Sequence, residues 1–333
     1  TGIVLAGSNK SGYSKWTSSA VAISVNQLAN YNNQVSFSGR NNFSSFTEKY
    51  LEELTRDRAD TNAALSNYIF GSSLAFRTFL VDTLSGVGGA VAGYQSLVPI
   101  STGVNQSYNA RTTGGYNEIA IGFAGNMADK LYVGGSFNIP IVKYNRELVY
   151  SERDATNDPT NQFSFFEYKE SYSSQGAGIG VKLGTIYKPT PFVRIGFAFH
   201  SPQFITMTDR IRSSLVANTE TYAGQRSESS DNLNSGRAGT SKYNITTPWR
   251  AIGSFSYVFR EINDTRLQKG FISADIEYVH YKGARFAVAG ENASDAGFRN
   301  YYSALNEAII DNYKGNINAR IGGELKFNTI MFR

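Results

Sequence analysis

The chain has 333 residues, of which 41% are hydrophobic, 14% aromatic and only 18% charged, with 32 glycines and no cysteine. This apolar content excludes a disordered chain, and no apolar run reaches the ~18 residues that a membrane-spanning helix needs. Without cysteine there are no disulfides, thiolate zinc sites or thiol nucleophiles. The net charge of +5 comes from scattered basic residues, whereas a nucleic-acid-binding protein gathers them on one face. A secreted β-protein and an outer-membrane β-barrel remain.

Alternation of apolar and polar side chains with a period of two predicts strands along most of the chain. The pattern is most regular near the C-terminal end, where Ile317, Ala319 and Ile321 alternate with Asn318 and Arg320. Several strands exceed the ~5–6 residues usual in soluble sheets and reach the ~9–11 residues of a tilted spanning strand. The eight predicted strands cover residues 13–29, 113–125, 131–150, 163–187, 192–214, 243–259, 270–286 and 316–327.

The connections between these strands alternate between short and long. The short ones lie at 126–130, at 188–191 and around Asn263 and Asp264, and the long ones cover 30–112, 151–162, 215–242 and 287–315. Up-and-down outer-membrane barrels show this alternation, with short turns on one side of the membrane and long loops on the other. A Greek-key sandwich has no reason to place every long loop at one end. We therefore predict an all-β, antiparallel up-and-down transmembrane barrel forming one domain over residues 1–333.

Two of the long connections are expected to contain helices. Apolar residues recur at roughly helical spacing in 43–70, where Asn41 or Asn42 could cap the first turn, and again in 301–313, before Gly315. An apolar helix face in a loop must pack on another surface. We expect these helices to lie over the mouth of the barrel.

In a membrane barrel the polar side of each strand lines the lumen while the apolar side meets lipid. Opposed charges are then expected to form salt bridges that neutralise the lumen, not a catalytic pair. Examples are Asp275 and Glu277 with Arg250 or Arg320. The charged residues that we expect to line the lumen are Glu118, Arg194, Arg250, Asp275, Glu277, Arg320 and Glu324.

The sequence offers little catalytic chemistry. Its two histidines are His200 and His280, and although His200 precedes Ser201, neighbouring strand residues point to opposite faces and cannot act as base and nucleophile. Carboxylates in 151–162 could hold calcium, but a solvated loop is the interpretation that we favour. We predict no enzymatic activity, no cofactor and no metal site.

Four segments resemble the FadL/OmpP1/TodX family of outer-membrane transport proteins, in the branch common in Bacteroidetes-type bacteria. They are PFVRIGFAFHSPQF (191–204), TTPWRAIGSFSYVF (246–259), GFISADIEYVHYKGARF (270–286) and INARIGGELKF (317–327). The resemblance runs from about Ser73 to Phe327. It implies a barrel of about fourteen strands in the bacterial outer membrane, plugged by an N-terminal hatch. Such proteins passively carry long-chain fatty acids or aromatic hydrocarbons, which leave through a gap in the wall.

The resemblance also implies partners and a binding site. We expect a monomer that contacts a hydrophobic small molecule, outer-membrane lipid and lipopolysaccharide, and no nucleic acid. An apolar catch among the outer helices would fall on Phe43, Phe46, Tyr50, Leu54, Ile69 and Phe70, and packing between helix and barrel is the alternative role for these residues.

The chain departs from the family pattern in two ways. It lacks the Asn-Pro-Ala signature of the hatch, and eight strands fall short of the family number. We therefore expect an internal fragment, an expectation that pairing between 13–29 and 316–327 would refute. Two other functions stay open: a non-specific porin, and a barrel that acts as partner in a secretion or adhesion assembly through the 215–242 loop.

Overall fold

The computed structural model describes residues 1–9, 13–86, 91–259, 269–290, 295–327 and 330–332. Their strands are β1 (Gly2–Ser8), β2 (Trp16–Asn30), β3 (Asn33–Asn41), β4 (Val81–Ser85), β5 (Val91–Ser96), β6 (Val104–Met127), β7 (Leu131–Asp154), β8 (Phe165–Thr190), β9 (Val193–His200), β10 (Phe204–Asn218), β11 (Gln225–Ser229), β12 (Gly239–Thr246), β13 (Arg250–Phe259), β14 (Gly270–His280), β15 (Arg285–Val288), β16 (Gly315–Phe327) and β17 (Ile330–Phe332). The helices are α1 (Glu48–Arg56), α2 (Thr61–Ser66), α3 (Ser72–Arg77), α4 (Ser230–Leu233), the short 3₁₀ helix η3 (Tyr281–Gly283) and α5 (Ala296–Asn312).

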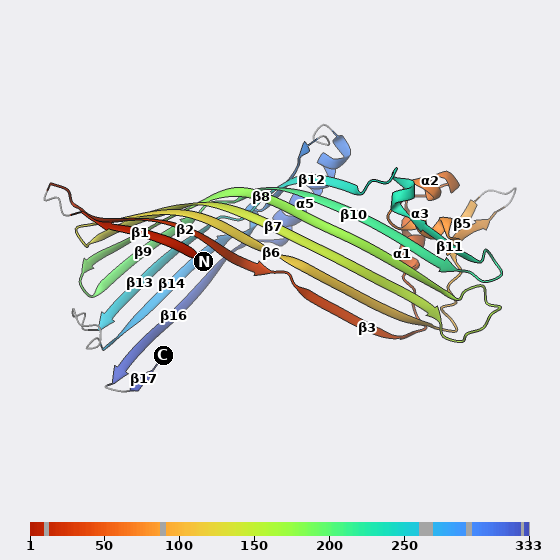
Figure 1. Ribbon diagram of the computed structural model, residues 1–333, viewed down its shortest axis with the longest axis horizontal. Coiled ribbons are helices and arrows are strands. Elements are labelled where there is room, and N and C mark those ends of the chain that lie inside the picture. Colours follow the sequence, from red (N-terminus) through yellow and green to blue (C-terminus); the bar gives the residue numbers. More distant parts are fainter. Residues whose placement is uncertain (10–12, 87–90, 260–268, 291–294, 328–329, 333) are drawn as a thin grey trace.

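The described residues form one antiparallel sheet of fifteen strands and the separate hairpin β4–β5. The main path of the sheet is β1-β2-β6-β7-β8-β9-β13-β14-β16-β17. Figure 1 shows that this sheet curls strongly into a half-barrel, with the turns after β6 and β8 at one end and the helices α1 to α3 at the other. The predicted all-β class and antiparallel order are therefore confirmed. In the described part, β2 and β16 do not pair with each other.

The sheet divides along its length because four of its long strands are interrupted. β8 pairs with β10 as far as Ile179, opposite Phe204, and then with β9 from Lys182, opposite His200. Similar breaks separate β2 from β3, β12 from β13 and β14 from β15. These breaks explain why several strands predicted as single elements, such as 192–214, are observed as two.

A close backbone approach at this level requires glycine. A Cβ atom on Gly178 would lie 2.1 Å from the carbonyl oxygen of Phe204, which no side chain could accommodate without moving β10. The alternating glycines around it thus serve the packing of two strands.

The convex face carries an exposed apolar band at the end of the sheet that has the short turns. On β7 this band extends from Leu131 to Ile141, ten residue steps, or about 33 Å along the strand and about 25 Å along the axis of a barrel with tilted strands. Beyond it the same face becomes charged. The exposed apolar members of the band include Val21, Ile23, Phe123, Val133, Phe137, Ile179, Val181, Leu183, Ile195, Phe197, Phe255, Ile272, Ile276 and Ile321. The exposed charged residues beyond it include Arg111, Lys143, Glu147, Arg153, Lys169, Arg210 and Arg212.

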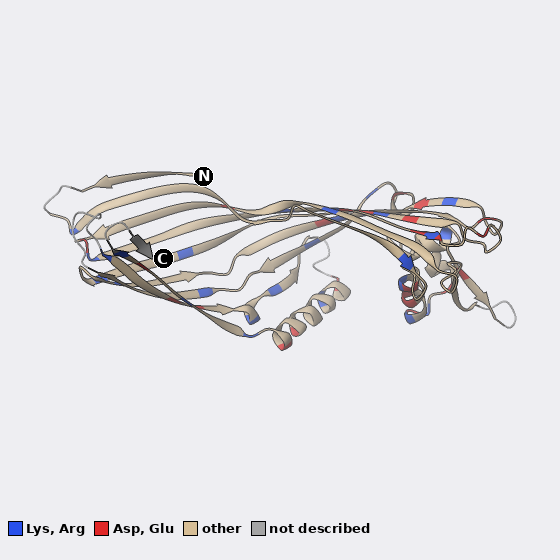
Figure 2. Ribbon diagram, turned by 90° about the horizontal axis from the view of Figure 1, so that it is seen from below, with Lys and Arg blue, Asp and Glu red and all other residues tan. Residues whose placement is uncertain are grey.

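The hydrophobic core lies at the opposite end of the molecule, between the helices and the concave face. Tyr50 and Leu54 of α1 and Leu74 of α3 are completely or almost completely buried there, against Tyr150 of β7 and Phe166 of β8. Figure 2 shows α1 to α3 and α5 on the same side of the curled sheet. The helices therefore pack on the inner surface of the half-barrel.

The continuous helix predicted for residues 43–70 is wrong in detail. The segment contains α1 and α2, interrupted where Arg58 adopts a positive φ of 48° and where the Asp60 side chain caps α2 by accepting a hydrogen bond from the backbone N–H of Ala63. Asn41 does not cap a helix: its side chain accepts from the backbone N–H groups of Phe43 and Ser44 and forms a turn. The helix predicted for 301–313 is confirmed as the C-terminal part of α5.

Other connections also hold more structure than the sequence suggested. The loop predicted for 215–242 contains the end of β10, all of β11 and α4 and the start of β12, and the first long connection contains β3 and the β4–β5 hairpin. Ala128 and Asp129 adopt positive φ angles in the short turn between β6 and β7. The turn predicted around Asn263 and Asp264 lies outside the described residues.

Candidate functional site

All seven charged residues predicted to line a lumen occur on one face of the sheet. The strand registers place them with residues such as Ala124, Lys182 and Ala198, on the side opposite the apolar band. Side chains from strands that are not neighbours in the sheet meet on this face: the Tyr116 hydroxyl of β6 donates to Gln203, which follows β9. Such contacts require an inward-curving surface, so this is the concave face.

The first charged cluster of this face surrounds Glu118, which is 1% exposed. Lys182 on β8 reaches across β7 so that its Nζ lies 2.5 Å from Glu118 Oε1, and the Gln203 amide donates to Oε2 at 2.9 Å. The carboxylate thus has one cationic and one neutral partner. This cluster ties β6 to the level at which the sheet divides.

The second charged cluster is centred on Glu277, which is 5% exposed. Arg250 Nη1 lies 3.2 Å from Glu277 Oε1, and Arg320 Nη2 lies 3.1 Å from Oε2. Arg250 also donates from Nε to His200 Nδ1 at 2.8 Å. Of the two predicted carboxylates, the ion pairing is therefore confirmed for Glu277. Both clusters border a polar cavity of about 480 Å³.

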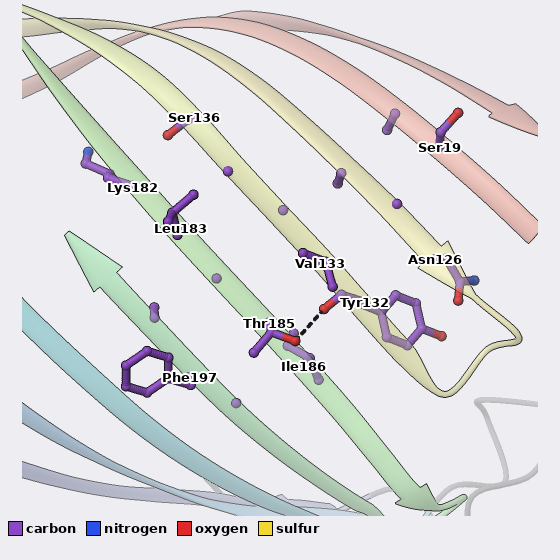
Figure 3. Close-up of a pocket in the computed structure, with 18 of the residues that line it drawn as sticks. Ser19, Asn126, Tyr132, Val133, Ser136, Lys182, Leu183, Thr185, Ile186 and Phe197 are labelled. Atoms are coloured by element: carbon purple, nitrogen blue, oxygen red, sulfur yellow. Dashed lines mark hydrogen bonds between the residues drawn. The ribbon is translucent and has the colours of Figure 1, made fainter. Parts of the chain in front are cut away.

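A second cavity lies nearer the short turns, behind the apolar band (Figure 3). Its volume is about 670 Å³. A row of small residues crosses six adjacent strands at its floor: Ala6, Ala20, Ala124, Gly134, Gly184 and Ala198. Lys182 and Ser136 lie at one end of this groove, and Tyr132 and Asn126 lie at the other (Figure 3). Because Ala and Gly side chains are short, they leave space above the inner surface of the sheet. The groove can therefore accept an apolar group that lies along the strands.

Residues 42–103, which contain α1 to α3 and are called the helical segment below, are held on the sheet by Glu152. This glutamate is a fully buried carboxylate on β7. Glu152 Oε1 accepts from the Phe46 backbone N–H at 2.8 Å, from Gln106 Nε2 at 2.9 Å and from the Tyr150 hydroxyl at 2.7 Å. Its Oε2 accepts from the Ser45 hydroxyl at 2.6 Å. All four donors are neutral. The sequence-based reasoning missed this residue, because its partners are up to 107 positions away in the chain.

The six residues proposed for an apolar catch separate into two groups. Tyr50 and Leu54 are core residues, and burial raises the pKa of the Tyr50 hydroxyl well above its ordinary value. Phe46 packs on Tyr150 with ring centroids 4.7 Å apart. Phe43 is 86% exposed, whereas Ile69 and Phe70 are half-buried. Packing thus accounts for Tyr50 and Leu54, and a ligand role for the other four stays a prediction.

The acidic residues of the described part of the chain do not gather into a metal-binding cluster. Among those residues there is no group of three or more histidine, aspartate and glutamate side chains that could hold a metal ion. In the 151–162 segment, Asp154 accepts from Thr156 and from the Asp158 backbone N–H, and Asp158 accepts from Thr160. These carboxylates therefore accept hydrogen bonds from groups of their own loop.

Comparisons with known proteins leave the family open. Within the described ranges, no helix is long and apolar enough to cross a membrane. No family model matches the sequence, and no curated protein or solved structure matches it either.

Proposed function

We propose that this chain forms the wall of an outer-membrane channel through which hydrophobic small molecules cross passively. The observation that carries the proposal is the pairing of two surfaces. The convex face bears an apolar band about as tall as the hydrocarbon layer met by outer-membrane barrels, whereas the concave face carries polar and small side chains. A soluble sheet has no reason to expose one complete apolar face.

The kind of substrate follows from the groove of small residues. Its walls are mainly apolar, and both carboxylates above it are engaged in ion pairs, so the groove favours an apolar group. Long-chain fatty acids and aromatic hydrocarbons are the substrates that the family resemblance implies. In this proposal the barrel is a monomer of the bacterial outer membrane, it contacts lipid and lipopolysaccharide, and the substrate leaves sideways.

Filling the groove provides the test. Ala124 and Gly184 would both be changed to Leu, and a Cβ at Gly184 would meet its nearest neighbour at an ordinary 3.7 Å. The control is Gly253→Leu, on the apolar face of β13, where a Cβ would have no neighbour within 4 Å. The protein in maltoside detergent is titrated with radiolabelled long-chain fatty acid and with toluene.

We expect saturable binding that the double substitution weakens and that Gly253→Leu leaves intact. Phe46→Ala and Phe70→Ala would report on the outer catch in the same assay. Binding that is absent, or equally strong in the filled variant, would contradict the proposed path through the groove.

A hydrophilic porin is the second candidate, because the cavity between the two charged clusters is polar. It predicts sugar or ion flux in vesicles without saturable binding of apolar solutes. Flux measured on the same preparations distinguishes the two functions.

A further inference from the structure

A third cavity, of about 700 Å³, lies under the N-terminal half of α5. It is separate from the groove and from the two charged clusters, and it lies on the concave face beyond the level of the apolar band. The described residues that line it come from β10, β12, β15, α5 and the residue that caps α5: Asp209, Ser241, Tyr243, Phe286, Asp295, Gly297, Phe298, Tyr301, Tyr302 and Leu305. Half of these residues are aromatic.

The aromatic rings form a fixed group on one side of the cavity. Tyr302 stacks on Tyr243 and on Phe286, with ring centroids 6.1 Å and 6.4 Å apart, and Tyr301 meets Tyr302 edge to face at 5.2 Å. The Asn306 side chain holds α5 against β15, because it accepts from the Phe286 N–H and donates to the Phe286 carbonyl, both at 2.8 Å. Tyr301, at 62% exposure, leaves its ring open to a ligand.

The charge of the cavity is negative. Asp209 accepts hydrogen bonds from the hydroxyls of Tyr172, Ser174 and Tyr243 at 2.7, 2.6 and 3.2 Å. Burial raises the pKa of Tyr243 to about 12, so its phenol stays protonated and donates. Three neutral donors leave the carboxylate charge uncompensated and part of its acceptor capacity free.

The second carboxylate, Asp295, caps α5 by accepting from the N–H groups of Gly297 and Phe298. It therefore also offsets the positive end of the helix dipole. None of the described residues that line the cavity is basic. Arg299 borders a neighbouring cavity that also touches Tyr302, and Lys242 points to the convex face by the alternation of β12.

We propose that this cavity binds a small organic cation of the quaternary or methylated ammonium class. Aromatic ring faces attract such cations electrostatically, and a nearby carboxylate supplies the opposite charge. A weakly hydrated, bulky cation suits a roomy aromatic site, whereas a metal ion needs several ligating carboxylates or histidines at close range. The site is distinct from the hydrophobic passage and adds a second class of ligand.

The test compares choline with 3,3-dimethylbutan-1-ol, which has the same shape without the charge. Binding to the protein in maltoside detergent is measured by calorimetry, and the chemical shift of the choline methyl protons reports whether they lie against aromatic rings. The variants are Asp209→Asn and Tyr301→Leu, and the matched control is Asp311→Asn, at the far end of α5 and outside the cavity lining.

We expect choline to bind about tenfold or more tightly than the neutral analogue, with an upfield methyl shift. Asp209→Asn should abolish this preference, Tyr301→Leu should weaken choline binding by about threefold to tenfold, and Asp311→Asn should change neither. Equal binding of the two probes, or binding of neither, would overturn the proposal. Because Tyr301 is exposed, its substitution keeps the test valid even where Asp209→Asn disturbs folding.

Two further arms separate the possible sources of the cation and the two proposals. If phosphatidylcholine vesicles compete with choline and phosphatidylglycerol vesicles do not, the ligand is a lipid headgroup. If neither kind of vesicle competes, the ligand is a free cation. Fatty-acid binding, measured in the same samples, reports on the hydrophobic passage independently. Failure of one proposal is therefore visible without failure of the other.

Discussion

Glu152 provides the sharpest test of how the helical segment is held on the sheet. In Glu152→Ala, the Phe46 N–H and the Tyr150 hydroxyl lose the only hydrogen-bond partners described for them, whereas Ser45 keeps Thr47 and Gln106 keeps the Ser44 carbonyl. Each buried donor left unsatisfied costs about 1–3 kcal/mol. The two together cost about 2–6 kcal/mol, part of which is offset because a buried charge is removed.

Glu152→Gln separates the acceptor from the charge. The Gln amide oxygen can still accept from the three groups that donate to Oε1, and its NH₂ group can donate to the Ser45 hydroxyl. The hydrogen bonds lose only the strengthening that the negative charge gave them. Because a buried charge is removed at the same time, the net loss of stability is about 1–2 kcal/mol. The order of stability should therefore be wild type, then Gln, then Ala. Glu147→Ala is the control, since Glu147 lies exposed on the convex face of the same strand.

Amide hydrogen exchange of α1 measures this local stability. A loss of 2 kcal/mol or more corresponds to opening about thirtyfold more often, and 1.4 kcal/mol to about tenfold. We expect faster exchange in α1 and earlier proteolysis within 42–103 in Glu152→Ala, with the β6–β7 ladder near the short turn unchanged. If Glu152→Ala and Glu147→Ala show the same protection, the proposed anchoring role of Glu152 is refuted.

Three further predictions concern the sheet. Phe137→Arg on the apolar band should lower the free energy of unfolding in lipid vesicles by about 2–4 kcal/mol, measured by denaturant titration. Asn145→Arg, on the same face beyond the band, should lower it by less than about 1 kcal/mol. Equal effects of the two substitutions would argue against membrane insertion of the band. Glu277→Gln should destabilise the protein by about 1–3 kcal/mol in the same titration, a value reduced because both arginine partners are partly exposed; a neutral outcome would mean that the cluster is not stabilising. Gly114→Ala should lower the yield of folded protein, because φ is +125° and a Cβ would lie 2.0 Å from the Lys143 carbonyl oxygen; normal folding would show that β6 can shift there.

Much of the sheet could be predicted from the sequence, because the alternation that marks a strand and its two faces lies within a few consecutive residues. The alternation of Ile317, Ala319 and Ile321 with polar residues is enough to assign β16 and its two faces, and the same reasoning placed Glu277 on the concave side. Each of the eight predicted strands overlaps an observed strand. Strand pairing then follows from neighbouring strands joined by short turns.

What could not be predicted depends on contacts between distant residues. The partners of Glu152 and Asp209 come from other strands and helices, so no spacing in the sequence announces them. The helical segment was predicted as one helix because apolar spacing was followed through Arg58 and Asp60, where the local backbone conformation stops the helix.

The helical segment begins and ends at one point of the sheet, because Asn41 of β3 pairs directly with Val104 of β6. Residues 42–103 therefore leave and rejoin the ladder at the same rung, the geometry in which an insertion or an excision disturbs a scaffold least. Residues 42–103 can therefore be exchanged, in evolution or by design, without altering the register of β3 and β6. What must be preserved is the donor set that meets Glu152 and the apolar surface that covers Tyr150 and Phe166. The outer cap can then diversify faster than the wall that carries it.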